Sequence, residues 1–122
     1  MPYEYILANL LSKVDGAVGV LFLDDSGETV DLACSDYTPY QMRVLGAYLG
    51  IYMRQLQKVL EGNDLGEPGM IHIERASLHI YAQPLPEGFY LVLVQRQPAV
   101  TVLAERRLQA AAVQLEKHLF AA

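Results

Sequence analysis

Cysteine is nearly absent from this sequence. Cys34 is the single thiol among 122 residues, so no disulfide can form within the chain. Small secreted proteins commonly depend on several disulfides, whereas a lone cysteine is typical of a reducing compartment. The first residues lack a basic segment followed by an apolar stretch, and no apolar run is long enough to span a membrane. We therefore expect a cytoplasmic protein without membrane insertion.

Basic residues are also scarce. Nine lysines and arginines stand against fourteen acidic residues, which gives a net charge of −5, and the basic residues form no run. Binding to nucleic acid or to anionic lipid relies on clustered positive charge. The composition therefore excludes non-specific binding to either, and it leaves open a protein partner that presents a basic patch.

Internal repeats, linkers and low-complexity segments are absent as well. The length is typical of one domain, and we expect residues 1–122 to form a single domain. Hydrophobic residues make up 52% of the chain and charged residues 19%, a globular composition that is slightly rich in apolar residues. The additional apolar content favours a second buried surface, such as a subunit interface.

The pattern of apolar residues predicts the order α-β-β-α-β-β-β-α. The expected helices cover residues 3–14, 38–61 and a final segment opened by Pro98, and the expected strands cover 17–23, 28–34, 70–75, 78–83 and 89–95. Strands joined by short turns pair antiparallel. The runs 17–23 and 89–94 are apolar throughout, so they need cover on both faces. The sequence therefore predicts an α/β (α+β) fold, a three-layer α/β/α sandwich around a mainly antiparallel sheet.

The helix expected over residues 38–61 carries more apolar surface than its own sheet can cover. Thr38, Pro39 and Gln41 predict a capping box at its start. One apolar stripe suits the sheet: Met42, Leu45, Leu49, Leu56 and Leu60. A second apolar surface begins at Tyr40 and is rich in tyrosine, a residue favoured at interface cores. Two glycines spaced four apart would let another helix approach, although such glycines more often pack within a subunit. The sequence thus predicts a dimer interface with the candidate residues Val44, Gly46, Tyr48, Gly50, Ile51, Tyr52 and Gln55.

Glycines and apolar positions also recur in a recognisable order along the chain. They are Leu10-Leu11 ahead of Gly16-Ala17-Val18-Gly19-Val20, then Leu23-Asp24 through Gly27 and Val30, and later Gly88-Phe89-Tyr90-Leu91-Val92-Leu93-Val94 before the long closing helix. Together with the element order and the total length, these residues resemble the Roadblock/dynein light-chain family over nearly the whole chain.

The resemblance implies a five-stranded antiparallel sheet in the order 2-1-5-4-3, with the first and last helices on one face. It also implies a homodimer formed through the middle helix and the third strand, which joins two sheets into one. Bacterial and archaeal members similar to this sequence often act on small Ras-like GTPases, as activating proteins or as scaffolds. Members that stimulate GTP hydrolysis reposition residues of the GTPase, so no inserted arginine is needed. We therefore expect a homodimeric, non-catalytic interaction domain that binds and regulates, or scaffolds, a small Ras-like GTPase.

Two histidines near the third and fourth strands are candidates for metal binding. A two-residue turn at 76–77 would pair Glu74 with His79 and His72 with Tyr81, which places all four side chains on one face. Two histidines and a carboxylate can bind zinc. The favoured interpretation is an ordinary half-solvated face, opposite the apolar residues of the same hairpin, so we expect no metal site.

No set of residues is spaced like a catalytic centre. Cys34 has no neighbouring histidine motif, and we expect it to be a half-buried structural residue. The glycines of residues 62–69 lie between a helix and a strand, whereas phosphate-binding loops run from a strand into a helix. We therefore expect no enzyme, no catalytic residue and no cofactor.

The alternative function is that of a small-molecule-binding sensor domain of PAS-like architecture. Such domains share the 2-1-5-4-3 sheet, but they usually connect the second and third strands by several short helices around a pocket. One long helix is expected at that place in this chain, which favours the GTPase-binding interpretation.

Overall fold

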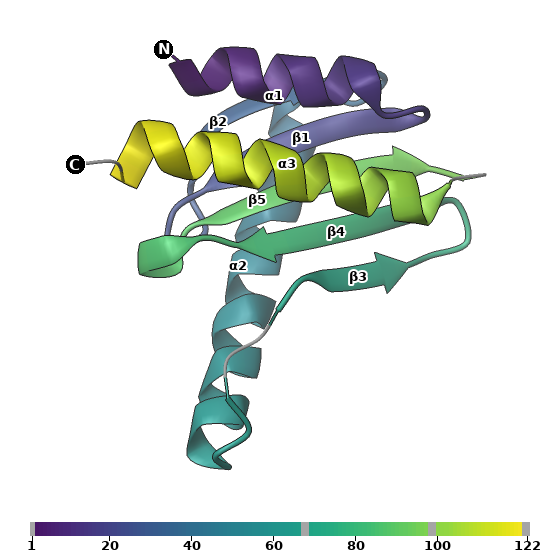
Figure 1. Ribbon diagram of the computed structural model, residues 1–122. Coiled ribbons are helices and arrows are strands. Elements are labelled where there is room, and N and C mark those ends of the chain that lie inside the picture. The colour runs from purple at the N-terminus through teal and green to yellow at the C-terminus, as the bar shows by residue number, and fades with distance from the viewer. Residues whose placement is uncertain (1, 67–68, 98–99, 121–122) are drawn as a thin grey trace.

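The computed structural model describes residues 2–66, 69–97 and 100–120 (Figure 1). Pro68 and Pro98, for which the sequence predicts a loop and a helix start, lie outside these residues. The described elements in chain order are α1 (Pro2–Lys13), β1 (Ala17–Leu23), β2 (Thr29–Cys34), α2 (Pro39–Gly62), β3 (Ile71–Glu74), β4 (Leu78–Pro84), the 3-10 turn η1 (Pro86–Gly88), β5 (Tyr90–Arg96) and α3 (Thr101–Phe120). This order is the predicted one with η1 added, because the turn expected between β4 and β5 closes as a short 3-10 helix.

The strands of the described residues form one five-stranded antiparallel sheet in the order β2-β1-β5-β4-β3. β1 and β5 occupy its centre, and they are buried along their length except at Ala17 and Arg96. β2 and β3 form the two edges. The predicted order is confirmed, and the two strands whose sequences are apolar throughout are the central ones.

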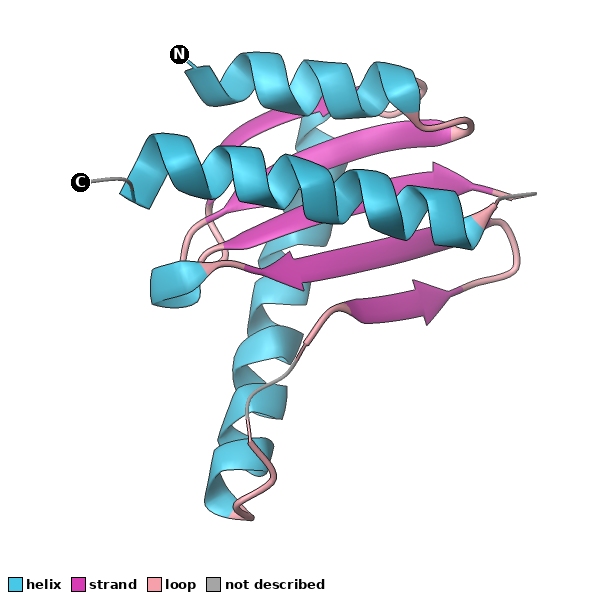
Figure 2. Ribbon diagram, viewed as in Figure 1, coloured by secondary structure: helices cyan, strands magenta, loops and turns pink. Residues whose placement is uncertain are grey.

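Helices cover both faces of the sheet, as Figure 2 shows, with α1 and α3 on one face and α2 on the other. Because side chains alternate along a strand, Val20 and Phe22 of β1 pack in the core beneath α1 and α3, whereas Leu21 and Leu23 pack in the core beneath α2. The predicted α/β/α sandwich is therefore confirmed. The two cores are separate, so α2 contacts the sheet independently of the other helices.

The β3–β4 hairpin has the register expected from the sequence. His72 lies opposite Tyr81 and Glu74 lies opposite His79. The turn between the strands is closed by Arg75, whose backbone N–H donates to the carbonyl oxygen of Leu78 at 2.8 Å.

A capping box begins α2, as predicted. The backbone N–H of Gln41 donates to Oγ1 of Thr38 at 3.1 Å, and the backbone N–H of Thr38 donates to Oε1 of Gln41 at 2.8 Å. Pro39 occupies the first turn, where its missing N–H costs no hydrogen bond. These contacts start the helix at a defined residue, and that start sets which side chains face the sheet.

Candidate functional site

α2 contacts the sheet through a narrow inner face. Met42, Leu49 and Met53 are buried there, each with an exposed fraction of 4% or less, and Leu45 packs beside them. Met42, Leu45 and Leu49 belong to the stripe that the sequence assigns to the sheet, whereas Met53 extends it. The sheet-facing side of the first half of α2 is therefore predicted correctly.

Gly46 and Gly50 are buried on this sheet-facing side of α2. A Cβ on residue 46 would lie 2.8 Å from Cδ2 of Leu23, and a Cβ on residue 50 would lie 2.6 Å from Cα of Gly27. The two glycines thus permit close packing within the subunit, on the sheet and on the β1–β2 turn. The structure gives no support to their place in the candidate dimer interface, because they face away from the surface that the rest of that set shares.

The opposite side of α2 is exposed and largely apolar. Tyr48 and Tyr52, in the middle of the helix, have exposed fractions of 61% and 64%. Residues three or four apart on a helix are surface neighbours, so these side chains form one continuous patch. We call this patch the outer face of α2, made up of Tyr40, Val44, Tyr48, Ile51, Tyr52, Gln55 and Val59. A patch of this kind is uncommon on a monomer and marks a candidate interaction surface.

The C-terminal turns of α2 extend past the sheet, below β3 in the view of Figure 1. Leu56 belongs to the stripe predicted to face the sheet, but its exposed fraction is 37%. That expectation is wrong because the sheet ends before this part of the helix, so no strand covers the side chain. The projecting end adds exposed apolar surface, including Val59 on the outer face.

β3 supplies a second candidate surface beside α2. It is four residues long and, within the described residues, it pairs with β4 alone. Ile71 and Ile73 turn toward the α2 side, where they pack against that core and stay partly exposed. No strand of residues 2–66, 69–97 and 100–120 pairs with the other edge of β3, and such an edge can pair with a strand of another chain.

Within the described residues, no helix has the length and apolar content needed to cross a membrane.

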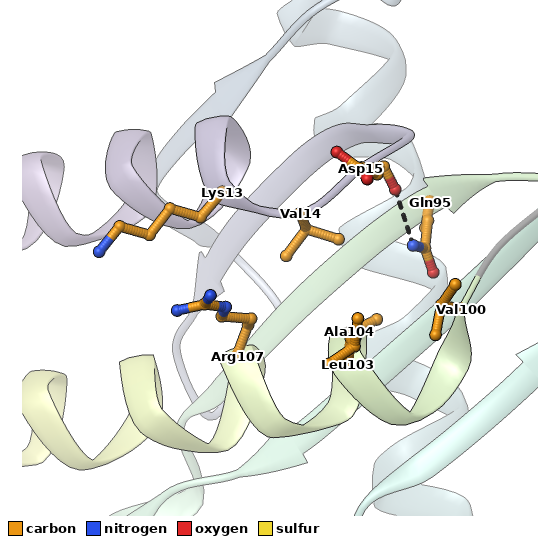
Figure 3. A pocket seen from close by; sticks show the side chains of 8 residues that line it. All are labelled: Lys13, Val14, Asp15, Gln95, Val100, Leu103, Ala104 and Arg107. Atoms are coloured by element: carbon orange, nitrogen blue, oxygen red, sulfur yellow. Dashed lines mark hydrogen bonds between the residues drawn. The ribbon is translucent and has the colours of Figure 1, made fainter.

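A hollow of about 250 Å³ lies between the end of α1 and the start of α3 (Figure 3). Gln95 is buried at its floor, and both ends of its amide are bonded. The Tyr81 hydroxyl donates to its Oε1 at 2.6 Å, and its Nε2 donates to the backbone oxygen of Asp15 at 2.8 Å. Lys13 and Arg107 stand at the rim. The buried amide therefore has hydrogen-bond partners at both ends. These two bonds link β4, β5 and the α1–β1 turn.

The cysteine considered in the sequence has the structural role expected of it. Cys34 is half-buried at the end of β2, and its Sγ donates to the backbone oxygen of Tyr37 at 3.3 Å. This contact ties the strand to the segment that leads into α2.

No family model matches the sequence, and no curated protein matches it. Solved structures, however, match the fold over nearly the whole chain. The Roadblock/LC7 domain from Streptomyces avermitilis has a TM-score of 0.84 at 13% identity, with 96% of this chain and 97% of that chain covered. MglB of Myxococcus xanthus has a TM-score of 0.88 at 16% identity, with 100% and 98% covered.

The protein therefore has the Roadblock/LC7 fold, as the resemblance in its sequence predicts. Within that fold it is similar to MglB structures from more than one organism. The gliding protein MglB from Thermus thermophilus matches with a TM-score of 0.76 at 16% identity, over 95% of this chain and 89% of that chain.

Proposed function

We propose that this protein is a homodimeric, non-catalytic interaction domain that binds a small Ras-like GTPase and regulates or scaffolds it. The outer face of α2 is the observation that carries the proposal. The inner face of α2 already packs against the sheet, and the tyrosines of the outer face take no part in that packing. The half-buried thiol of Cys34 suits the reducing cytoplasm, where we place the protein.

The first part of the proposal is that a second copy of the chain covers the outer face. Burying a large apolar side chain completely contributes about 1.5–3 kcal/mol. Association costs roughly 4–15 kcal/mol in lost freedom of motion. Val44, Tyr48, Ile51 and Tyr52 occur twice in a symmetric dimer, so completing their burial contributes a free energy of the same order as that cost. We keep Gln55 in this interface as a polar residue at its margin.

The edge strand β3 supports the same assembly. Its free edge and the outer face of α2 belong to consecutive elements, so one partner copy could cover both surfaces. Pairing β3 with its counterpart would join two sheets, as the family resemblance implies. An MglB structure with a tetrameric arrangement shares this fold, with a TM-score of 0.76 at 18% identity over 97% of this chain and 90% of that chain.

The second part of the proposal is the GTPase partner. Its support is the family resemblance together with the fold shared with MglB. The net charge of −5 suits a partner that presents a basic patch. We propose that the domain acts on its partner by positioning residues of the GTPase, so the chain itself needs neither a catalytic residue nor a cofactor.

The alternative, a small-molecule sensor of PAS-like architecture, would need an enclosed ligand pocket. The hollow between α1 and α3 has a volume of about 250 Å³, below the roughly 300–1,000 Å³ typical of ligand sites, and two larger hollows of about 340 and 490 Å³ are open depressions of the surface. In addition, one continuous helix of 24 residues, α2, joins β2 to β3 where sensor domains usually have several short helices. We therefore rank the sensor second.

A binding assay with a small Ras-like GTPase from the same organism tests the proposal. The GTPase is loaded either with GDP or with a non-hydrolysable GTP analogue, and binding is followed by calorimetry. We expect binding that differs between the two nucleotide states by about tenfold or more, a free-energy difference of about 1.4 kcal/mol. Release of phosphate from GTP then separates an activating protein from a scaffold. Failure to bind in either state would contradict the GTPase part of the proposal.

A further inference from the structure

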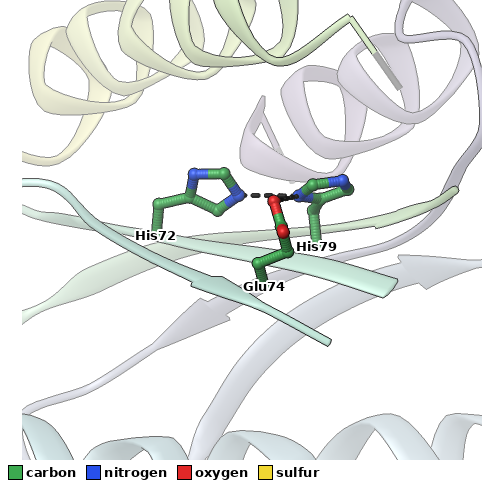
Figure 4. A group of neighbouring side chains, drawn as sticks. All are labelled: His72, Glu74 and His79. Atoms are coloured by element: carbon green, nitrogen blue, oxygen red, sulfur yellow. Dashed lines mark hydrogen bonds and ion pairs between the residues drawn. The ribbon is translucent and has the colours of Figure 1, made fainter. Parts of the chain in front are cut away.

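The structure brings two histidines and a glutamate together on the sheet face opposite α2. Nε2 of His72 lies 2.7 Å from Nδ1 of His79, and Oε1 of Glu74 lies 3.8 Å from that same Nδ1. Figure 4 shows the carboxylate of Glu74 pointing toward the space between the two rings. One potential ligand atom from each residue lies within 4.8 Å of the others. The register predicts that these residues share a face, but it does not predict such short distances.

We propose that His72, Glu74 and His79 form a binding site for a divalent transition-metal ion, for which Zn²⁺ is the best fit. Two imidazoles and one carboxylate are a known ligand set for Zn²⁺ in proteins. Imidazole favours zinc, copper and nickel over magnesium and calcium, which prefer ligands composed of oxygen alone. The site lies on the sheet face opposite the outer face of α2, although two of its ligands belong to β3, the edge strand of the proposed dimer.

The distances at Nδ1 of His79 suit a tetrahedral ion after small rotations of side chains, in which the ion replaces the hydrogen bond between His72 and His79. Zinc bonds of about 2.0–2.1 Å place neighbouring ligand atoms about 3.3 Å apart. The two distances to Nδ1 of His79, 2.7 Å and 3.8 Å, lie on either side of that value. Glu74 is exposed and can rotate without disturbing the core, whereas His79 is 3% exposed and stays fixed. Because His72 and Glu74 are exposed, the fourth position is open to water.

The surroundings of the site also favour a cation. The ring of His72 stacks on that of Tyr81, with 4.6 Å between the ring centroids, which limits the orientation of the imidazole. Glu74 adds a carboxylate beside the two imidazole rings, with its Oε1 3.8 Å from Nδ1 of His79.

A bound ion would change the edge of the sheet. His72 and Glu74 belong to β3, whereas His79 belongs to β4. An ion held by all three would link the edge strand to the strand beside it. Metal binding should therefore slow hydrogen exchange of the β3 amides. An ion bound elsewhere on the surface would leave these exchange rates unchanged.

Thermal unfolding with one equivalent of Zn²⁺, in chelator-free buffer, tests the site. We expect the Tm to rise by about 5 °C or more, to return to its starting value with a chelator, and calorimetry to give one ion per chain. Equal concentrations of Mg²⁺ should give no shift. A wild-type Tm that Zn²⁺ leaves unchanged would overturn the proposal.

Four variants locate the binding: two at proposed ligands and two controls. His72→Ala and Glu74→Gln change exposed side chains, and each should weaken zinc binding by about tenfold or more. His118→Ala removes an exposed histidine at the end of α3 and should leave zinc binding unchanged. If His72→Ala does not fold, Glu74→Gln decides the question alone. A Tm shift that survives both ligand variants, or that disappears with His118→Ala or Cys34→Ser, places the ion elsewhere and overturns the assignment.

Discussion

Gly50 of α2 lies so close to Gly27 in the β1–β2 turn that a Cβ on residue 50 would stand 2.6 Å from Cα of Gly27. The same turn is held by Arg54, whose Nη1 donates to the backbone oxygen of Asp25 at 3.1 Å. These contacts set the distance between α2 and the turn, and they fix the rotation of α2 about the helix axis. The outward direction of Tyr52 therefore depends on two glycines in its own subunit.

Gly50→Ala should destabilise the protein by about 1–3 kcal/mol. Alanine is favoured over glycine in a helix by about 1 kcal/mol, but the new methyl group would meet backbone atoms that cannot move aside cheaply. Gly46→Ala should cost less, because its methyl group would meet the ends of the flexible side chains of Leu21 and Leu23. Urea unfolding of both variants measures the order.

Gly62→Ala is the matched control in the same helix. Apart from its chain neighbours and the backbone of its own helix, no atom of the described residues lies within 4 Å of a Cβ placed on residue 62, so this variant should be as stable as the wild type or slightly more stable. If Gly50→Ala proved as stable as Gly62→Ala, the close contact between α2 and the turn would be wrong.

Thr38→Ala should lower the free energy of unfolding by about 1 kcal/mol, because it removes the side-chain oxygen that accepts from the N–H of Gln41. For a chain of this length the corresponding fall in Tm is about 3–5 °C. Ser35→Ala, in the exposed segment before the helix, keeps the backbone hydrogen bond to Val18 and should change the Tm by less than about 2 °C. Equal effects of the two variants would argue against the capping box.

Stability should fall with rising pH between about 10 and about 12, partly through Tyr81. Its ordinary pKa is 10.0, and burial, with the charges of Glu105 and Glu74, raises the pKa of Tyr81 to about 12 in the folded protein. The folded state thus holds this proton more tightly than the unfolded chain. The stabilisation is complete below pH 10 and is lost as the pH rises toward 12.

Tyr81→Phe should reduce that pH dependence. It should also cost about 1–3 kcal/mol near neutral pH, because Oε1 of the buried Gln95 would lose its donor. Urea unfolding at pH 8 and pH 10.5 separates the two effects, with the exposed Tyr5→Phe as the control. A pH dependence identical in Tyr81→Phe and the wild type would contradict the assignment.

The sequence predicted the sheet well because its strands carry strong local signals. The run at Ala17–Leu23 is apolar throughout and became a central strand with the expected bounds. The pairing of Glu74 with His79 followed from a two-residue turn, since alternation leaves few other registers. Both features depend on residues that are close together in the chain, so the sequence alone is enough to predict them.

The placement of Gly46 and Gly50 was not predicted, because a glycine adds nothing to the pattern of apolar side chains. A signal was available, however: at 100° per residue, both positions lie within about a quarter turn of the buried Met42. The exposure of Leu56 had no such signal, since the width of the sheet beneath the helix depends on long-range pairing. The 2.7 Å approach of His72 to His79 depends likewise on strand twist and side-chain rotation.

Tyr52→Asp should give a folded monomer. The substitution would bury an unpaired carboxylate in the dimer at a cost of several kcal/mol. The total free energy of association of a dimer with a micromolar to nanomolar Kd is only about 8–12 kcal/mol. Tyr5→Asp is the matched control, because Tyr5 is a comparably exposed helical tyrosine on the opposite face of the sheet, and it should stay dimeric. Circular dichroism reports folding in both variants. A Tyr52→Asp protein that no longer folds, or that dimerises with unchanged affinity, would mean that the outer face of α2 is not the interface.

The mass of the wild-type protein in solution tests the central claim most directly. One chain has a mass of 13.6 kDa. Sedimentation equilibrium at micromolar concentration should give twice that mass, because each copy covers the exposed tyrosines of the other. A mass of 13.6 kDa under these conditions would leave the outer face of α2 without a partner copy and would contradict the account.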